Sequence, residues 1–237
     1  MPDLPRSYSL SVFFPCFNEE ENVRRAYESA DRVCRSLAVD YEILFIDDGS
    51  TDRTAEIVKT IAAADPRVRT VHHAANSGYG AALRSGFEAA SKRLVFFTDG
   101  DGQFDISEMP PLLPLLERYD IVAGYRLRRQ DGLIRKFNGW GWTKLAALLF
   151  GVKVKDVNCA FKIFRRAVFD NIELNCTGAL ISAEILAKAA RRGFSMTQSG
   201  VRHYPRLSGR PTGAKWRVIG RAFREIPRLY KEIREPS

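Results

Sequence analysis

The sequence predicts an α/β protein with a mostly parallel sheet and helices on both faces. Four apolar runs rich in β-branched and aromatic residues alternate with three segments of helical spacing in the first hundred residues. This alternation is typical of a parallel sheet that is covered on both sides. A polar cluster follows each apolar run. Because ligands bind beyond the carboxyl ends of such strands, we expect the four clusters to share one edge and form a site.

The first strand is expected over residues 8–14, where aromatic and aliphatic side chains dominate, and Pro15 is expected to end it. A helical pattern then runs from Val23 to about Leu37. The second strand is expected over residues 41–46 and is followed by two consecutive aspartates.

Residues 50–52 supply N-cap chemistry for the next helix, whose apolar positions recur between residues 55 and 62. A third, short strand over residues 68–71 leads to a turn that contains glycines and to a helix over roughly 81–91. The fourth strand is the apolar run 94–98.

Two carboxylates and an amide, Asp99, Asp101 and Gln103, follow the fourth strand at alternate positions. In an extended chain this alternation puts all three side chains on one side, and Gly100 and Gly102 leave room for a bulky anion beside them. Oxygen ligands favour a hard divalent cation such as Mg²⁺ or Mn²⁺. The same letters also fit an ordinary turn after a strand, so the pattern alone leaves both interpretations open.

Four motifs occur in a definite order: PCFNEEEN at 15–22, DDGSTDRT at 47–54, NSGYGAALRSGF at 76–87 and DGDGQ at 99–103. Together they resemble the inverting family 2 glycosyltransferases with the GT-A fold, a Rossmann-like α/β fold. The resemblance is strongest to the dolichol-phosphate mannosyltransferase-like polyprenyl-phosphate glycosyltransferases, and it covers about residues 8–210. It implies a nucleotide-sugar donor, with GDP or UDP as the nucleotide, a divalent metal and a polyprenyl phosphate acceptor.

The resemblance also implies roles for single residues on the donor side. The residues expected to bind the nucleotide-sugar are Pro15, Phe17, Asn18, Glu19, Asp47, Asp48, Gly78, Asp99 and Gly100. The metal that bridges the diphosphate is expected on Asp99, Asp101 and Gln103. Pro15 could equally be a simple strand end, and the glycines near Gly78 could form a plain turn.

Three arginines fit the phosphates of donor and acceptor. A strand expected over residues 121–126 ends at Arg126, which matches a family position associated with phosphate binding. Arg135 lies in a segment that resembles the family's acceptor-side helix, although Gly139 stands where the family commonly has serine. Arg206 matches a late segment in which an arginine reaches the diphosphate. A guanidinium suits phosphate because its planar fork makes two charge-assisted bonds at once.

Two further carboxylates are expected near the acceptor and the donor sugar. Asp156 begins a stretch that resembles the family's Asp-x-x-x-Gly-Phe-Lys-x-Phe-Arg, with Ala160 in place of the usual glycine. Glu184, in a helix expected over residues 181–189, lies at the family's acidic position near the donor sugar. For Asp156, a capping aspartate beside a strand is the alternative interpretation.

The resemblance implies in-line attack of the acceptor phosphate on the anomeric carbon, with inversion and departure of the nucleoside diphosphate. A phosphate oxygen is already ionised, so no strong general base is needed. An arginine and a metal held by Asp101 would neutralise the leaving diphosphate, and Asp156 and Glu184 would orient sugar and acceptor.

Composition limits the remaining choices. At 237 residues and 45% hydrophobic content, the chain is expected to form one GT-A domain over residues 1–210. The sequence contains no run of about 20 apolar residues that would span a bilayer, and we expect no secretory signal. The four cysteines have neither metal-ligand spacing nor a disulfide framework, which favours a reducing cytoplasm.

The formal net charge of +9 is concentrated near the C-terminus. Residues 211–237 combine basic and apolar positions in an amphipathic helical pattern interrupted at Pro227, and the tract 207–214 could form a mobile lid. Such a helix can lie on anionic lipid, so we expect peripheral attachment at the cytoplasmic membrane face. A solvated helix packed on the domain is the alternative.

Other functions remain open at this point. Nucleic-acid binding is not expected, because no base-stacking module or recognition helix accompanies the charge. A glycosyltransferase acting on a soluble glycan or small-molecule acceptor, and a non-catalytic nucleotide-sugar binder, are the alternatives. The oligomeric state cannot be inferred from the sequence.

Overall fold

The computed structural model describes residues 8–37, 39–127, 133–206 and 216–234, without the side chains of 133–138, 216–219 and 221. The strands are β1 Ser9–Cys16, β2 Asp40–Asp47, β3 Val68–His72, β4 Leu94–Thr98, β5 Ile121–Leu127, β6 Phe161–Arg165 and β7 Met196–Arg202. The helices are α1 Val23–Ser36, α2 Thr54–Ala64, α3 Tyr79–Ala89, α4 Leu133–Phe150, α5 Ile181–Arg191 and α6 Trp216–Arg234. Short 3₁₀ helices lie at Ile106–Glu108, Pro110–Glu117 and Arg166–Val168.

The strands form one sheet in the order β3-β2-β1-β4-β6-β5-β7. All neighbouring pairs are parallel except the two made by β6, which runs antiparallel to β4 and β5. The predicted mostly parallel sheet is therefore confirmed. Since β1, β2, β3 and β4 run in the same direction, the polar segments that follow them emerge at one edge.

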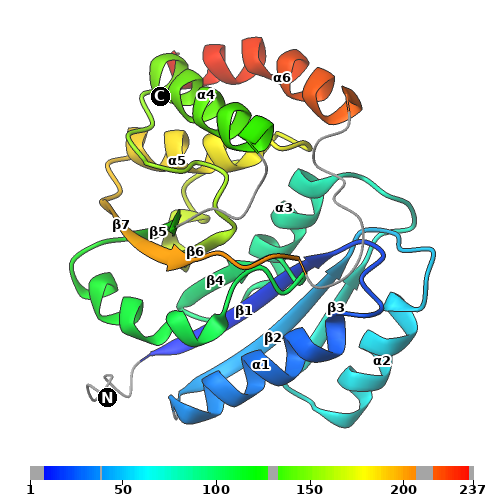
Figure 1. Cartoon of the computed structure of the whole chain (residues 1–237). Coiled ribbons are helices and arrows are strands. Elements are labelled where there is room, and N and C mark those ends of the chain that lie inside the picture. The colour runs from blue at the N-terminus through cyan, green and yellow to red at the C-terminus, as the bar shows by residue number, and fades with distance from the viewer. Residues whose placement is uncertain (1–7, 38, 128–132, 207–215, 235–237) are drawn as a thin grey trace.

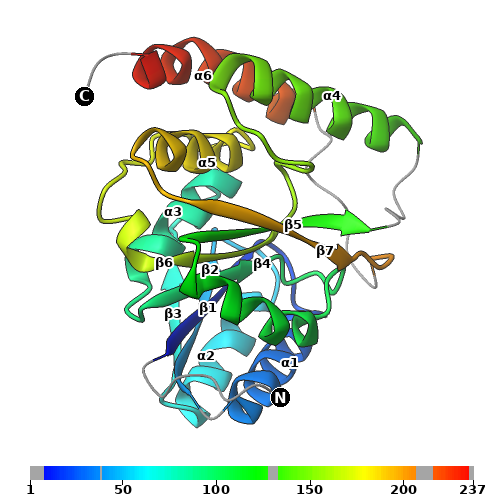
Figure 2. The same ribbon diagram turned by 90° about the vertical axis from the view of Figure 1, so that its left-hand side faces the viewer.

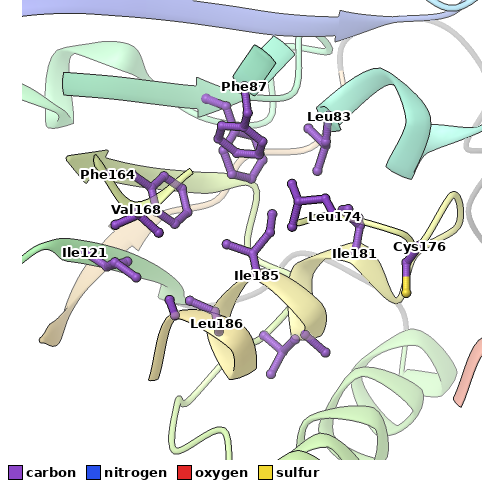
Figure 3. Close-up of a cluster of buried hydrophobic side chains, with 14 of the residues drawn as sticks. Leu83, Phe87, Ile121, Phe164, Val168, Leu174, Cys176, Ile181, Ile185 and Leu186 are labelled. Atoms are coloured by element: carbon purple, nitrogen blue, oxygen red, sulfur yellow. The ribbon is translucent and has the colours of Figure 1, made fainter. Parts of the chain in front are cut away.

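Helices cover both faces of the sheet, as predicted (Figures 1 and 2). On one face, α1 and α2 pack with the 3₁₀ helices Ile106–Glu108 and Pro110–Glu117 on a core that includes Phe14 and Phe96. On the other face, α3 and α5 pack on a second core (Figure 3), in which Phe87 of α3 contacts Phe164 of β6 and Ile185 of α5 lies nearby. Beyond α5, α4 and α6 form an outer layer in both views.

The central strands read as nearly continuous apolar runs because both of their faces are buried. In β1, Phe13 joins the core under α3 while Val12 and Phe14 join the core under α1 and α2. In β4, Phe97 joins the core under α3, and Phe96 joins the core under α1 and α2. Burial of aromatic side chains on both faces makes this strand pair the rigid support of the edge.

Three expected boundaries need correction. β1 does not stop at Pro15 but continues to Cys16, because pairing with β4 ends at Phe13 and a residue without an N–H is tolerated beyond it. α3 begins at Tyr79, two residues earlier than expected. α6 continues through Pro227 instead of being interrupted there.

The C-terminal helix is packed on the domain. Leu229 is 2% exposed in the same core as α5, and Ile226 and Tyr230 pack against that core. The tract 207–214 lies outside the described residues. Of the helices that are described, none is both long and apolar enough to cross a membrane.

Candidate functional site

The segments after β1 and β2 interlock at the sheet edge. The backbone N–H of Asn18 donates to Ser50 Oγ (2.9 Å), and Asn18 Oδ1 accepts from the N–H of Thr51 (2.8 Å). Asn18 has φ +56°, a left-handed conformation that asparagine tolerates better than most residues. Glu19 is tied to the same segment, because its N–H donates to Thr54 Oγ1 (2.8 Å).

The second aspartate after β2 holds the glycine-containing turn before α3. Asp48 Oδ1 accepts from the N–H of Ser77 (2.9 Å), and Oδ2 accepts from the N–H of Gly78 (2.8 Å). Gly49, at φ +70°, allows this approach, since a Cβ there would lie 2.5 Å from the Ala75 carbonyl carbon. Asp48 thus shapes the turn that carries Gly78. The predicted contact of Asp48 with base or ribose would use lone pairs of its carboxylate that these two hydrogen bonds leave available.

Both aspartates also contact histidines to which the sequence analysis gave no role. Asp47 Oδ2 lies 2.7 Å from His72 Nδ1, and Asp48 Oδ1 lies 2.7 Å from His73 Nδ1. The other ring nitrogen of His73 lies 2.9 Å from Ser85 Oγ of α3. The parallel register of β2 and β3, which aligns Asp47 with His72, explains the pairing and could have predicted it.

The segment after β4 turns instead of remaining extended. β4 ends at Thr98, Gly102 has φ +76°, and the N–H of Gln103 folds back onto Asp101 Oδ1 (3.0 Å). The Gln103 side-chain amide donates to the Tyr204 carbonyl (3.2 Å). The expected alternation is therefore wrong, and Gln103 is placed as a link to Tyr204 without support for its role as a third metal ligand.

Three carboxylates and one guanidinium influence one another electrostatically at this edge. Burial, followed by repulsion from Asp101, raises the pKa of Asp99, and burial also raises the pKa of Glu19. Arg206 forms ion pairs with Glu19 and, at 3.3 Å, with Asp101. The three carboxylates form a negatively charged site, and the guanidinium of Arg206 is paired with two of them.

The donor set fits a hard divalent cation in part. Asp99 and Asp101 supply carboxylate oxygens, which are ligands that Mg²⁺ and Mn²⁺ prefer. Within the described ranges, no three His, Cys, Asp or Glu side chains are grouped so that they could hold a metal. Two protein carboxylates would therefore share such an ion with phosphate oxygens and water, as is usual for Mg²⁺ beside a diphosphate.

A residue that the sequence analysis did not select also reaches this cluster. The hydroxyl of Tyr79, the first residue of α3, donates to Asp99 Oδ1 (3.1 Å). The sequence signal for this residue is its position inside the NSGYG motif, directly after Gly78.

The remaining residues expected on the donor side lie close to these groups in the chain. Pro15 and Phe17 are half-buried at the end of β1 and just beyond it. Gly100 is buried, and a Cβ at this position would lie 3.7 Å from Cys16 Sγ, an ordinary contact. Its lack of a side chain is therefore not required by the protein's own packing.

Arg126, predicted to bind phosphate, and Asp156, predicted to lie near the acceptor, form one unit. Arg126 at the end of β5 makes a bidentate ion pair with Asp156, with Nε and Nη2 at 2.6 and 2.9 Å from the carboxylate oxygens. The nearby Lys162 is fully buried, and burial lowers its pKa. Its ammonium donates to the carbonyls of Val157 (3.0 Å) and Cys159, which fixes the segment after Asp156. Arg135 lies in α4, and its side chain is outside the described part.

Glu184 does not contact the site. It is 0% exposed, and its carboxylate accepts from the backbone N–H groups of Asn175 (2.9 Å) and Cys176 (2.8 Å) and from Lys188 Nζ (2.7 Å). A carboxylate enclosed in this way supports the segment before α5, so the structure gives no basis for a contact between Glu184 and a donor sugar. Helical position alone could not reveal which way this side chain points.

Comparison with known structures gives the fold. The protein is similar to glucosyl-3-phosphoglycerate synthase from Mycobacterium tuberculosis in complex with Mn²⁺, UDP and phosphoglyceric acid, with a TM-score of 0.71 over 97% of this chain and 80% of that chain. A complex of the same synthase with Mg²⁺ and UDP gives a TM-score of 0.70 over 95% and 79%. Sequence identity is 20% in both cases, so this likeness concerns the fold, and it confirms the predicted GT-A architecture.

Two relatives found by sequence share more identity with this chain than the structures do. The chain is 34% identical over 176 residues to the dodecaprenyl-phosphate galacturonate synthase of Rhizobium johnstonii, covering 73% of this chain and 52% of the relative. It is 31% identical over 201 residues to the undecaprenyl-phosphate 4-deoxy-4-formamido-L-arabinose transferase of Yersinia enterocolitica, covering 83% and 61%. The chain thus spans between half and two thirds of the length of these relatives.

The family model described as glycosyl transferase family 2 matches residues 11–173, a stretch that contains the edge segments after β1, β2 and β4 and the Arg126–Asp156 pair. With this match and relatives above 30% identity, the chain belongs to glycosyl transferase family 2.

Proposed function

We propose that this protein is a metal-dependent inverting glycosyltransferase that moves a sugar from a nucleotide-sugar to a polyprenyl phosphate. The observation that carries the donor half is the cluster of Glu19, Asp99 and Asp101 with the Arg206 guanidinium between strand ends. The acceptor half is supported by two relatives that are named for a polyprenyl phosphate, the dodecaprenyl-phosphate galacturonate synthase and the undecaprenyl-phosphate 4-deoxy-4-formamido-L-arabinose transferase.

The donor would lie across the ends of β1, β2 and β4. The interlocked segments at Asn18 and Asp48 form a rigid wall for the nucleoside, and Arg206 supplies positive charge for the diphosphate. UDP is the first nucleotide to test, because the structurally similar synthase is seen with UDP and Mn²⁺. GDP-sugars are the other donors in the proposal.

Asp99 and Asp101 would hold the divalent cation. When bound, such an ion supplies positive charge to the diphosphate. In the described state Arg206 pairs with Asp101 and Glu19, so its guanidinium is close enough to turn to a diphosphate placed beside the same carboxylates.

The transfer would form a bond between an acceptor phosphate oxygen and the anomeric carbon while the bond from that carbon to the diphosphate oxygen breaks. The bonding electrons leave with the nucleoside diphosphate, and the configuration at the anomeric carbon inverts. The attacking oxygen is already ionised, so no proton has to be removed. Arg126, oriented by Asp156, would bind the acceptor phosphate.

We further propose that the outer layer of α4 and α6 lies on anionic lipid at the cytoplasmic membrane face. On α4, Trp140 (58% exposed), Lys144 and Leu148 (80% exposed) recur at intervals of four, so they form one exposed stripe. On α6, Phe223 (59% exposed) stands beside exposed Arg224. Exposed apolar side chains among cations match the chemistry of an anionic bilayer surface.

The decisive experiment is product formation from a panel of UDP- and GDP-sugars with a short polyprenyl phosphate, with Mn²⁺ or Mg²⁺ and with chelator. A metal-dependent glycolipid is expected. Transfer only to soluble glycans would show that the acceptor is a glycan and not a polyprenyl phosphate. Saturable donor binding without product would favour a non-catalytic nucleotide-sugar binder.

A paired substitution sharpens this test. Asp101→Asn should abolish metal-dependent transfer, because it removes a carboxylate charge at the centre of the cluster. Asp40→Asn, at the exposed opposite end of β2, is the matched control and should keep full activity. Full activity in Asp101→Asn would refute the proposed metal site.

The membrane proposal has its own measurement. Flotation with vesicles that contain phosphatidylglycerol should recover the protein, whereas neutral phosphatidylcholine vesicles should recover less, and added salt should weaken the difference. Leu148→Ser should reduce flotation without changing transfer to a detergent-solubilised acceptor. Equal recovery with both kinds of vesicle would remove the electrostatic part of the proposal.

A further inference from the structure

Tyr79 is anchored on both sides of its backbone. The preceding N–H, of Gly78, donates to Asp48 Oδ2 (2.8 Å), and the following N–H, of Gly80, donates to the Thr177 carbonyl (3.0 Å). Gly80 is held so closely that a Cβ there would lie 2.6 Å from the Thr177 carbonyl carbon. The start of α3 is therefore fixed against two separate parts of the fold.

From this fixed position the Tyr79 side chain reaches across to the end of β4. Its hydroxyl donates to Asp99 Oδ1 at 3.1 Å, and the residue stays 37% exposed. The described residues place no hydrogen-bond donor on the other oxygen, Oδ2. One oxygen of Asp99 is thus committed to the protein, and the second is not.

We propose that Tyr79 is a positioning residue for Asp99: it holds one carboxylate oxygen so that the other is presented to the cation that accompanies the donor diphosphate. This inference rests on the proposed function, since it assumes that Asp99 serves a metal-bound nucleotide. It adds a residue and a task to that site.

The physical reason lies in the rotational freedom of a carboxylate. An aspartate that lacks a second anchor can rotate about its side-chain torsions, and binding a cation must then fix that rotation at an entropic cost. A charge-assisted bond from a phenol whose backbone is anchored on both sides reduces this freedom before the ligand arrives. Asp99 also adjoins Asp101, so a fixed orientation keeps the two carboxylates in a constant relationship.

The test is Tyr79→Phe, which removes only the hydroxyl. Tyr27→Phe is the matched control, because Tyr27 also donates to an aspartate (Asp65 Oδ2, 3.0 Å) but does so in the contact between α1 and the end of α2. The dissociation constants of UDP and GDP are measured by calorimetry in the presence and absence of Mn²⁺, without any sugar transfer. Thermal unfolding of both variants is recorded in parallel.

Tyr79→Phe should weaken Mn²⁺-dependent nucleotide binding about tenfold, the effect of losing one hydrogen bond to a charged group, while Tyr27→Phe leaves it unchanged. In an Asp99→Asn background the same substitution should have little further effect, because the two residues then no longer act together. Unchanged Mn²⁺-dependent binding in Tyr79→Phe, or an equal loss with and without Asp99, would overturn the inference.

These outcomes are separable from failure of the proposed function. If the unmodified protein shows no Mn²⁺-dependent binding of either nucleotide, the proposed donor site is wrong and the inference falls with it. If the unmodified protein binds and Tyr79→Phe lowers only the unfolding temperature, Tyr79 stabilises α3 and the positioning role is refuted while the proposed function stands.

Discussion

Arg206, which follows β7, forms an ion pair with Asp101, which follows β4, with 3.3 Å between Nη1 and Oδ2. The same guanidinium pairs with Glu19 after β1. A guanidinium of the chain therefore offsets part of the negative charge in the most acidic part of the edge. A divalent cation and a diphosphate would meet Arg206 in opposite ways, because the first competes with it and the second attracts it.

Arg206→Ala should separate these two effects. Without the guanidinium, Mn²⁺ alone should bind more tightly, whereas UDP in the presence of Mn²⁺ should bind about tenfold more weakly because a charge-assisted bond to phosphate is lost. Calorimetry with Mn²⁺ alone and then with UDP measures both. Arg192→Ala, an exposed arginine after α5, is the control. Changes of the same sign in both titrations would contradict this account.

The Arg126–Asp156 pair leads to a second prediction. Both side chains are largely buried, at 12% and 9% exposure, so Asp156→Asn removes one charge from a buried ion pair. We expect a loss of about 3 kcal/mol in unfolding free energy and a higher KM for the acceptor, with nucleotide binding unchanged. Urea unfolding and transfer kinetics measure these quantities. A rise in the nucleotide dissociation constant, with an unchanged KM for the acceptor, would show that Arg126 and Asp156 act in donor binding and not in acceptor binding.

The enclosed position of Glu184 makes the third prediction a matter of stability. In Glu184→Gln the side-chain amide would face donors from Asn175, Cys176 and Lys188, and we expect a loss of about 2–4 kcal/mol in unfolding free energy. Turnover per folded molecule should stay within about twofold. A variant that is as stable as the original protein but inactive would restore the catalytic role that the motif suggested.

The strands that support the edge could be predicted from sequence because their signal is local. β1 and β4 are apolar on both faces, so the run of letters alone identifies them. The location of Asp99 and Asp101 at this edge could be predicted for the same reason, since they directly follow β4. Because β1 to β4 run in the same direction, the polar clusters that follow them are expected at the same edge of the sheet.

Pairings between distant residues could not be predicted in this way. Asp156 meets Arg126 across 30 positions, and the contact depends on β6 running antiparallel to β5. Gln103 turns to Tyr204 because Gly102 takes a left-handed conformation, which the alternation of polar residues does not reveal. Such contacts depend on tertiary geometry, and a linear motif carries little information about it.

Acid stability provides a fourth prediction, away from the site. Hydrogen bonds from Arg67 lower the pKa of Asp65 to about 2 from its ordinary value of 3.8. A depressed carboxylate pKa stabilises the folded state above the unfolded pKa, and this contribution is lost as the pH falls from about 4 to about 2. Asp65→Asn should therefore lower the unfolding free energy by about 2 kcal/mol at pH 7 and have little effect near pH 2.

Urea unfolding at several pH values measures this difference in unfolding free energy, and a difference that does not depend on pH would contradict the prediction. Glu56→Gln, on the exposed face of α2, is the control.

The last prediction compares one substitution at two helical glycines. Alanine favours helix over glycine by about 1 kcal/mol, so propensity alone predicts that both changes stabilise the protein. At Gly141 in α4 a Cβ meets nothing within 4 Å, and Gly141→Ala should raise the unfolding free energy by about 0.5–1 kcal/mol. At Gly80 the Cβ would lie 2.6–2.8 Å from the backbone of residues 176–178, which cannot rotate away as a side chain would.

Gly80→Ala should consequently lower the unfolding free energy, by about 1–3 kcal/mol, and should also weaken nucleotide binding because the start of α3 and Tyr79 must move. Urea unfolding of the two variants gives the signs directly, and calorimetry with Mn²⁺ and UDP gives the second effect. If both glycines respond with the same sign, close packing against residues 176–178 does not determine the position of α3. A destabilised Gly80→Ala that binds nucleotide normally would show that α3 can shift without disturbing Asp99.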